Sequence, residues 1–86
     1  LQNRIKGENL VKLVFFNTGF IENEFKVIPE INKIERNGNE LKIYSNDSLD
    51  IRAELFNICA RNNWVIIEMS QEKLSVEYIF QKLTKN

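Results

Sequence analysis

The sequence predicts a small α+β domain: one antiparallel four-stranded sheet with two helices, in the order β-α-β-β-α-β, followed by a further helix. Three observations predict this fold. Short β-branched and aromatic runs alternate with helical patterns, an Asn-Gly pair separates two strand-like segments, and an apolar repeat of helical period covers residues 49–62. The order is the split β-α-β, or ferredoxin-like, pattern, in which right-handed crossovers place the first and third strands in the centre.

The first strand is expected over Leu10–Phe16, which is apolar on both of its faces, as a central strand is. The residues before it, 1–9, contain the breakers Gly7 and Asn9 and are expected to be a linker or frayed start, so that a single domain covers 10–86. Thr18 is the expected N-cap of a short helix over Phe20–Val27, which Pro29 ends.

A hairpin is expected where Ile31–Arg36 and Glu40–Tyr44 flank Asn37-Gly38-Asn39. The two apolar residues of the first arm, Ile31 and Ile34, differ in parity and are therefore expected on opposite faces. The charges on this arm are typical of an exposed edge strand.

The clearest helix is expected over Leu49–Asn62, capped from Asn46-Asp47-Ser48 and ended by a left-handed residue at Asn62-Asn63. Its predicted buried stripe, at helical spacing, consists of Ile51, Leu55, Ile58 and Cys59, widened by Phe56 and Ala60.

The last strand is expected over Trp64–Met69, with Trp64 and Ile66 on one face and Val65, Ile67 and Met69 on the other. A polar turn at Gln71–Lys73 then leads to a terminal helix from Ser75. The apolar stripe of that helix consists of Val76, Ile79, Phe80 and Leu83.

Two helices cover only one face of such a sheet, so the other face is expected to expose an apolar patch that needs a cover and is a candidate interface. Its apolar residues would be Val14, Phe16, Tyr44, Trp64 and Ile66. We expect the stripe of the terminal helix to pack on the domain's own sheet; the alternative is contact with a second copy or another domain.

The residue types present exclude several classes of site. The 86 residues contain no histidine and one cysteine, which excludes a serine–histidine triad, an internal disulfide and multi-cysteine zinc sites. Twelve basic and twelve acidic residues cancel, which argues against binding to nucleic acid. No run approaches the ~20 apolar residues of a membrane-spanning helix. Three dispersed glycines build no phosphate-binding loop. From these residue types together we expect no catalytic residue and no cofactor or metal site.

Carboxylate pairs and the cysteine are the remaining chemical candidates. The pairs Asp47/Asp50 and Glu22/Glu24 are interpreted as a helix cap and a solvated surface. Cys59 falls on the apolar stripe of its helix and is interpreted as a buried structural thiol.

The end of the chain resembles a known family. Ser75-Val76-Glu77-Tyr78-Ile79-Phe80, followed by Leu83-Thr84, resembles the "S-L-E-x-[VI]-F … L-T" ending of bacterial ATP-binding cassette (ABC) transporter ATPase subunits. Tyr44–Asp47, Ile51–Glu54 and Asn62–Trp64 look most like the gliding-motility-associated member of that family. Leu74, Val76 and Tyr78 depart from the usual motif, which has proline, leucine and an acidic residue there.

The resemblance implies a non-catalytic C-terminal accessory domain that regulates, scaffolds or dimerises the ATPase. Because the chain starts at Leu1 rather than Met, we expect a fragment of a longer subunit, with ATP and Mg²⁺ bound only upstream. The implied partners are the ATPase domain, a second copy and a membrane permease, at the cytoplasmic side of the inner membrane. Two alternatives stay open: an ACT-like sensor of a small ligand, and a free-standing protein-interaction module.

Overall fold

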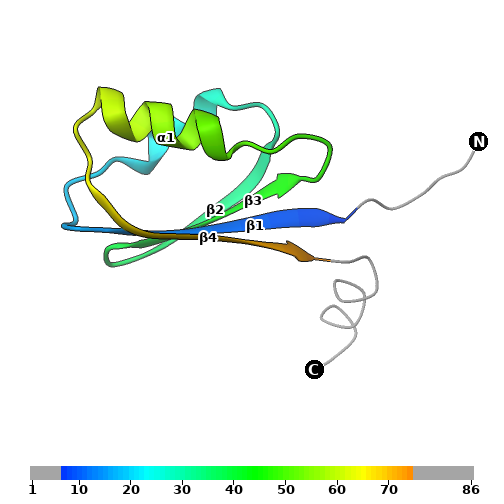
Figure 1. Cartoon of the computed structure of the whole chain (residues 1–86), viewed down its shortest axis with the longest axis horizontal. Coiled ribbons are helices and arrows are strands. Elements are labelled where there is room, and N and C mark those ends of the chain that lie inside the picture. Colours follow the sequence, from blue (N-terminus) through cyan, green and yellow to red (C-terminus); the bar gives the residue numbers. More distant parts are fainter. Residues whose placement is uncertain (1–6, 75–86) are drawn as a thin grey trace, which may run out of the picture.

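The computed structural model describes residues 7–74, which form an α+β fold with an antiparallel sheet beneath one α-helix (Figure 1). The elements in chain order are β1 (Glu8–Phe15), the 3-10 helix η1 (Glu22–Val27), β2 (Ile31–Asn37), β3 (Glu40–Asn46), α1 (Arg52–Arg61) and β4 (Ile66–Leu74). The strands are arranged β2-β3-β1-β4, so the first and third strands are central, as predicted. The predicted terminal helix from Ser75 lies outside the described residues.

β1 is one of the two central strands because it pairs with β3 on one side and β4 on the other. Its side chains alternate strictly: Asn9, Val11, Leu13 and Phe15 are buried on the side of α1, and those between them are half-buried. The strand begins at Glu8, so the pairing extends two residues into the segment predicted as a linker.

The first connection is a 3-10 helix, η1, rather than the expected helix over residues 20–27, and Thr18 does not cap it. Its N-cap is Ile21, which makes no side-chain capping bond. Only Phe25 is buried within η1, while Val27 is 72% exposed, so the segment lacks the repeating apolar stripe that holds an α-helix on a sheet. Phe20 anchors the preceding loop by stacking on Phe15, with ring centroids 3.9 Å apart.

Arg36 of β2 fixes this irregular connection from the neighbouring strand. Its guanidinium donates hydrogen bonds to the carbonyl oxygens of Thr18 (2.6 Å) and Phe20 (2.9 Å), and to Glu22 Oε1 (2.8 Å). A planar group with several donors can satisfy three acceptors at once, which lysine cannot do in the same geometry. The loop therefore has a defined path without regular secondary structure.

Both edge strands contain a β-bulge, and this corrects the predicted facing of their side chains. On β2 the register shifts between Ile31 and Lys33, so Ile31 and Ile34 both pack against the core. Beyond the bulge, Lys33 and Glu35 lie on the face away from α1, whereas Arg36 stands opposite the buried Leu41 on the side of α1. A bulge inserts one residue and thereby reverses the alternation beyond it.

The bulge of β4 lies where Val14 pairs with Glu68 and Phe15 pairs with Ile66, which leaves Ile67 without a partner on β1. Ile66 therefore faces the core and Ile67 is 59% exposed. The predicted grouping of Val65, Ile67 and Met69 on one face is wrong, because Met69 packs with Ile66 against the core.

α1 begins at Arg52, three residues later than predicted, and its N-cap is Ile51 without a side-chain cap. The Asn46 side chain instead accepts hydrogen bonds from Ser48, and Asp50 Oδ1 accepts one from the Arg52 backbone N–H. The polar cluster therefore shapes the loop and does not cap the helix. Asn63 has φ 60°, which confirms the predicted left-handed residue after the helix.

The core forms between α1 and the sheet. The four predicted stripe residues of α1 are all buried there: Ile51, Leu55, Ile58 and Cys59. The widening of the stripe was wrong, because Phe56 is 60% exposed and Ala60 is also exposed.

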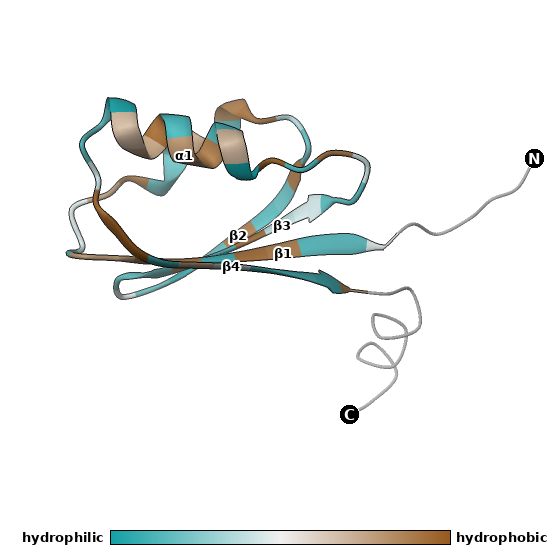
Figure 2. Ribbon diagram, in the orientation of Figure 1, coloured by the Kyte–Doolittle hydropathy of each residue, from teal (hydrophilic) through white to brown (hydrophobic). Residues whose placement is uncertain are grey.

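β4 runs through Ile66–Leu74, so the polar turn predicted at Gln71–Lys73 is wrong. These residues pair with β1, Val11 with Gln71 and Asn9 with Lys73. Figure 2 shows the change from the apolar start of β4 to its hydrophilic second half. An edge strand needs only one partner for its backbone and one covered face, so its polar side chains do not end it.

Candidate interaction surface

The residues predicted as one apolar interface lie in three places. Val14 and Tyr44 lie on the face of the sheet away from α1, called here the open face, where both are half-buried. Trp64 and Ile66 pack against the core on the side of α1. Phe16 follows β1 and is 69% exposed. The predicted patch therefore does not form.

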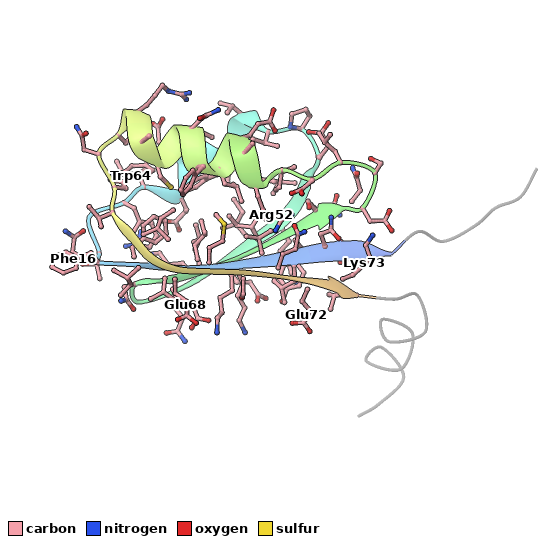
Figure 3. The ribbon with its side chains drawn as sticks, in the orientation of Figure 1. Phe16, Arg52, Trp64, Glu68, Glu72 and Lys73 are labelled. Atoms are coloured by element: carbon pink, nitrogen blue, oxygen red, sulfur yellow. The ribbon has the colours of Figure 1, made fainter. Side chains whose placement is uncertain are left out.

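Trp64 is part of the core edge rather than of an outer patch. Its ring lies 5.8 Å from that of Phe25 and 6.5 Å from that of Phe20, measured between centroids, in tilted and edge-on arrangements. These are favourable aromatic geometries. Trp64 thus closes the end of the core where α1 leads into β4 (Figure 3).

The open face is dominated by charged side chains. Lys33 Nζ lies 4.6 Å from the centroid of the Tyr44 ring and 3.4 Å from Glu35 Oε2, and the Tyr44 hydroxyl donates to Glu35 Oε1 at 3.3 Å. Lys12 Nζ lies 3.9 Å from Glu40 Oε2. Such exposed pairs each contribute about 1 kcal/mol or less, so they keep the face solvated more than they stabilise it.

Two of the four candidate acid–base residues, Asp50 and Glu22, are engaged in ion pairs. Asp50 forms a two-pronged contact with the Arg52 guanidinium, at 2.6 and 2.9 Å, and the hydrogen bonds from Arg52 lower the pKa of Asp50 to about 2. The hydrogen bond from Arg36 lowers the pKa of Glu22. Both carboxyl groups are therefore ionised at neutral pH and unsuited to act as general acids.

Cys59 is buried, 2% exposed, and burial raises its pKa to about 11. The thiol is therefore protonated at neutral pH and is not a nucleophile. Within residues 7–74 no three acidic or cysteine side chains gather as a metal site would require. In the same range no helix is long and apolar enough to cross a membrane.

Asn9 and Ser45 form a buried polar pair on the side of α1. They stand directly opposite each other in the β1–β3 ladder, and Asn9 Oδ1 and Ser45 Oγ have no hydrogen-bond partner among the described residues. An amide and a hydroxyl without a neighbouring base do not activate a nucleophile. This pair therefore adds polarity to one end of the core and no reactive group.

The free edge of β4 is the best candidate for a binding surface among the described residues. Within the described sheet β4 pairs only with β1, so one side of its backbone has no strand beside it. Two adjoining apolar depressions, which share Phe56, lie between this edge and α1. Together they are called here the β4 groove. Its apolar lining consists of Ala53, Phe56, Cys59, Ala60, Trp64, Ile66 and Met69, and the ion-paired Asp50 and Arg52 line the part next to Met69.

Sequence reasoning assigned Phe56 and Ala60 to the core and therefore missed this groove. The signal was present: Ala53, Phe56 and Ala60 are spaced i, i+3, i+7 and so form a second apolar strip on α1 beside the buried one. The free edge was not predicted because the polar residues Gln71–Lys73 were interpreted as a turn. Their composition is that of a turn, while their pairing is that of a strand.

No protein-family model, curated protein or solved structure matches the chain.

Proposed function

We propose that the chain is the C-terminal accessory domain of the ATP-binding subunit of a bacterial ABC exporter, of the gliding-motility type. Its own role is to bind protein segments, not to catalyse a reaction. The motif from Ser75 to Thr84 supports the family, and the β4 edge supports the role.

The observation that carries the interaction role is a free edge strand beside an apolar groove. An exposed edge presents backbone donors and acceptors that another chain can pair with, and the charged residues on this one, Glu68, Glu72 and Lys73, restrict that pairing to strands of matching charge. Here Phe56 and Ile67 are 60% and 59% exposed next to it, which gives a partner apolar surface as well as backbone groups.

We infer further that the fold is a variant of the ferredoxin-like split β-α-β arrangement, in which η1 replaces the first helix. The central position of β1 and β3, and the hairpin that joins β2 to β3, support this inference. The fold by itself does not assign a function.

In this proposal ATP and Mg²⁺ bind to the upstream ATPase domain of the same subunit, which couples hydrolysis to transport through a membrane permease. The domain described here would lie on the cytoplasmic side, attached to the inner membrane through the parent. Its partners would be the ATPase domain, the permease or a second copy.

The decisive test is the reading frame upstream of the Leu1 codon. The proposal requires a Walker-type phosphate loop within about 250 residues, the length of one or two domains. A frame without such a loop refutes the family assignment. Calorimetry of the isolated chain with Mg-ATP should show no binding, and micromolar affinity would refute the accessory role. An amino acid or other small effector that raises the Tm would favour the ACT-like alternative.

A further inference from the structure

We propose that the free edge of β4 binds an extended segment of another protein by strand addition, and that this segment is basic on one face and apolar on the other. Strand addition supplies affinity through backbone hydrogen bonds and specificity through alternate side chains. Both components can be read from the residues of β4.

Two hydrogen bonds at the end of β1 show which of its residues point their backbone N–H and C=O groups toward β4. The Phe15 N–H donates to the Asn39 carbonyl oxygen at 2.8 Å, on the β3 side. The next amide, that of Phe16, donates to the Val65 carbonyl oxygen at 2.9 Å, on the β4 side. In an antiparallel ladder this alternation continues along the strand, so the even-numbered residues of β1 direct their backbone groups to β4.

The partners of those even-numbered residues are Glu68, Ser70 and Glu72. Their backbone groups therefore face β1. The residues between them direct N–H and C=O to the free edge: these are Met69, Gln71 and Lys73. An incoming strand would pair with these three.

The side chains of β4 specify what that strand carries. Glu68 and Glu72 project from the open face, away from α1, as Figure 3 shows, and Ser70 lies between them. No salt bridge within 4 Å involves either glutamate among the described residues. Directly opposite positions in a sheet favour unlike charges. A partner strand with lysine or arginine at two positions four residues apart would match this face.

The other face of the incoming strand would meet the β4 groove. Met69 and Ile66 are half-buried there and Phe56 stands exposed at its border, so apolar side chains on the alternate positions would cover them. Covering apolar area gains about 25 cal/mol per Å² before the cost of ordering the segment. Gln71 and Lys73 share this face of β4 with Met69, so the apolar contacts of the incoming strand would centre on Met69 and Phe56. The two faces of β4 thus favour a strand that is basic on one side and apolar on the other.

Charge disfavours a second copy of this chain as the occupant. If two β4 strands paired antiparallel about Ser70, Glu68 of each would stand directly opposite Glu72 of the other. Moving the two-fold axis to Met69 or Gln71 only shifts these carboxylates to diagonal positions, so all four remain neighbours. Like charges in these positions are destabilising.

The inference gives the proposed interaction role a surface, and it is tested on the chain alone. A negative result here would leave the upstream reading frame, and with it the family assignment, unaffected.

The probe is a capped peptide of sequence TVKVSVKVT, whose lysines match the spacing of Glu68 and Glu72. A peptide of sequence TVEVSVEVT is its matched control. Titration followed by amide chemical shifts should place the lysine peptide at β4 and at Phe56, with affinity at least about tenfold above that of the glutamate peptide. Equal affinity for the two peptides, or no binding of either, refutes the proposal.

Gln71→Pro tests the backbone component. It removes an amide that faces the free edge and leaves the pairing with β1 intact, as proline does on an edge strand. We expect loss of lysine-peptide binding in a folded protein, while Gln71→Ala binds within about threefold of wild type. Binding by a folded Gln71→Pro variant contradicts strand addition. The double variant Glu68→Lys/Glu72→Lys should invert the peptide preference, and it decides the matter if Gln71→Pro does not fold.

Two further measurements on the free chain, amide hydrogen exchange and sedimentation, test whether the β4 edge is already covered by the chain's own residues or by a second copy. The amides of Met69, Gln71 and Lys73 should exchange fast, and those of Ser70 and Glu72 slowly. Slow exchange of the first set in a monomer would mean that the chain's own residues already cover the edge. A dimer in sedimentation that Gln71→Pro dissociates would assign the edge to a second copy. Either result overturns the proposal.

Discussion

The guanidinium carbon of Arg36 lies 3.9 Å from the centroid of the Phe20 ring, and Arg36 Nη1 donates a hydrogen bond to the carbonyl oxygen of the same residue at 2.9 Å. One arginine therefore holds both the side chain and the backbone of Phe20. Phe20 in turn stacks on Phe15 of the central strand. The connection between β1 and η1 is thus tied to the sheet through a polar side chain from an edge strand.

Replacing Arg36 with alanine should lower the free energy of unfolding by about 1–3 kcal/mol, because several carbonyl and carboxylate acceptors lose a charged donor. Arg36→Lys should recover only part of this loss, since an ammonium cannot match the planar fork. Urea unfolding measures both. Lys33→Ala, on the same strand but facing solvent, is the control and should cost about 0.5 kcal/mol or less. Equal losses for Arg36 and Lys33 would contradict this role.

The Glu22–Arg36 pair should make stability depend on pH. The hydrogen bond from Arg36 lowers the pKa of Glu22 below its usual value of 4.5. A carboxyl group with a lowered pKa in the folded state contributes stability above its unfolded pKa, and loses it as the pH falls through the folded pKa. The urea midpoint should therefore decrease below about pH 4.5, and less steeply in Glu22→Gln. An unchanged slope in Glu22→Gln would show that the pair contributes nothing.

Neighbouring isoleucines of β4 should respond very differently to truncation. Ile66→Ala should cost about 1–3 kcal/mol because its side chain packs against the core, whereas Ile67→Ala should cost less than about 1 kcal/mol. The measurement is again urea unfolding of the two variants. The reverse order would place the bulge at a different residue.

Gly38 should resist replacement for a backbone reason alone. Its φ is +64°, and an added Cβ would meet nothing within 4 Å. Gly38→Ala should therefore cost about 1–2 kcal/mol from the left-handed conformation, and Gly38→Asn less. Gly19→Ala is the control, because its φ is not positive and the nearest atom to its Cβ is 3.5 Å away. It should be neutral within about 0.5 kcal/mol, and thermal unfolding would compare the three.

Cys59 should be unreactive in the folded protein, since it is buried and its pKa is raised to about 11. Thiol labelling at neutral pH should be slow without denaturant and fast once the domain unfolds. Rapid labelling of the native state would mean that the register of α1 is wrong.

Periodicity predicted the parts of the fold whose apolar spacing is regular. The strict alternation of β1 and the helical repeat from Ile51 to Cys59 were both confirmed by burial. Both belong to elements that meet the core along their whole length. There the hydrophobic pattern and the secondary structure have the same period.

Periodicity failed at the edges of the sheet. Ile31/Ile34 and Ile66/Met69 are three residues apart yet share a face, because a bulge in each strand shifts the alternation by one residue. A bulge depends on pairing with a distant strand, so local sequence does not specify it.

The candidate site at β4 could not be predicted from the sequence, because it too depends on pairing between distant strands. Gln71 and Lys73 have turn-like composition, and only their pairing with β1 reveals a strand with a free edge. The second apolar strip of α1 was visible in the sequence, but its exposure depends on which elements cover the helix.

The pairing of Glu8 with Leu74, at the outer ends of β1 and β4, determines how the domain responds to tension. Because the two strands are antiparallel, a pull through these ends acts across the ladder, and its hydrogen bonds break one after another rather than together. The β1–β4 ladder should therefore separate at low force, starting from the Glu8–Leu74 pair. Such a pull would separate β4, the strand that carries the free edge, from β1 before it disturbed the rest of the sheet.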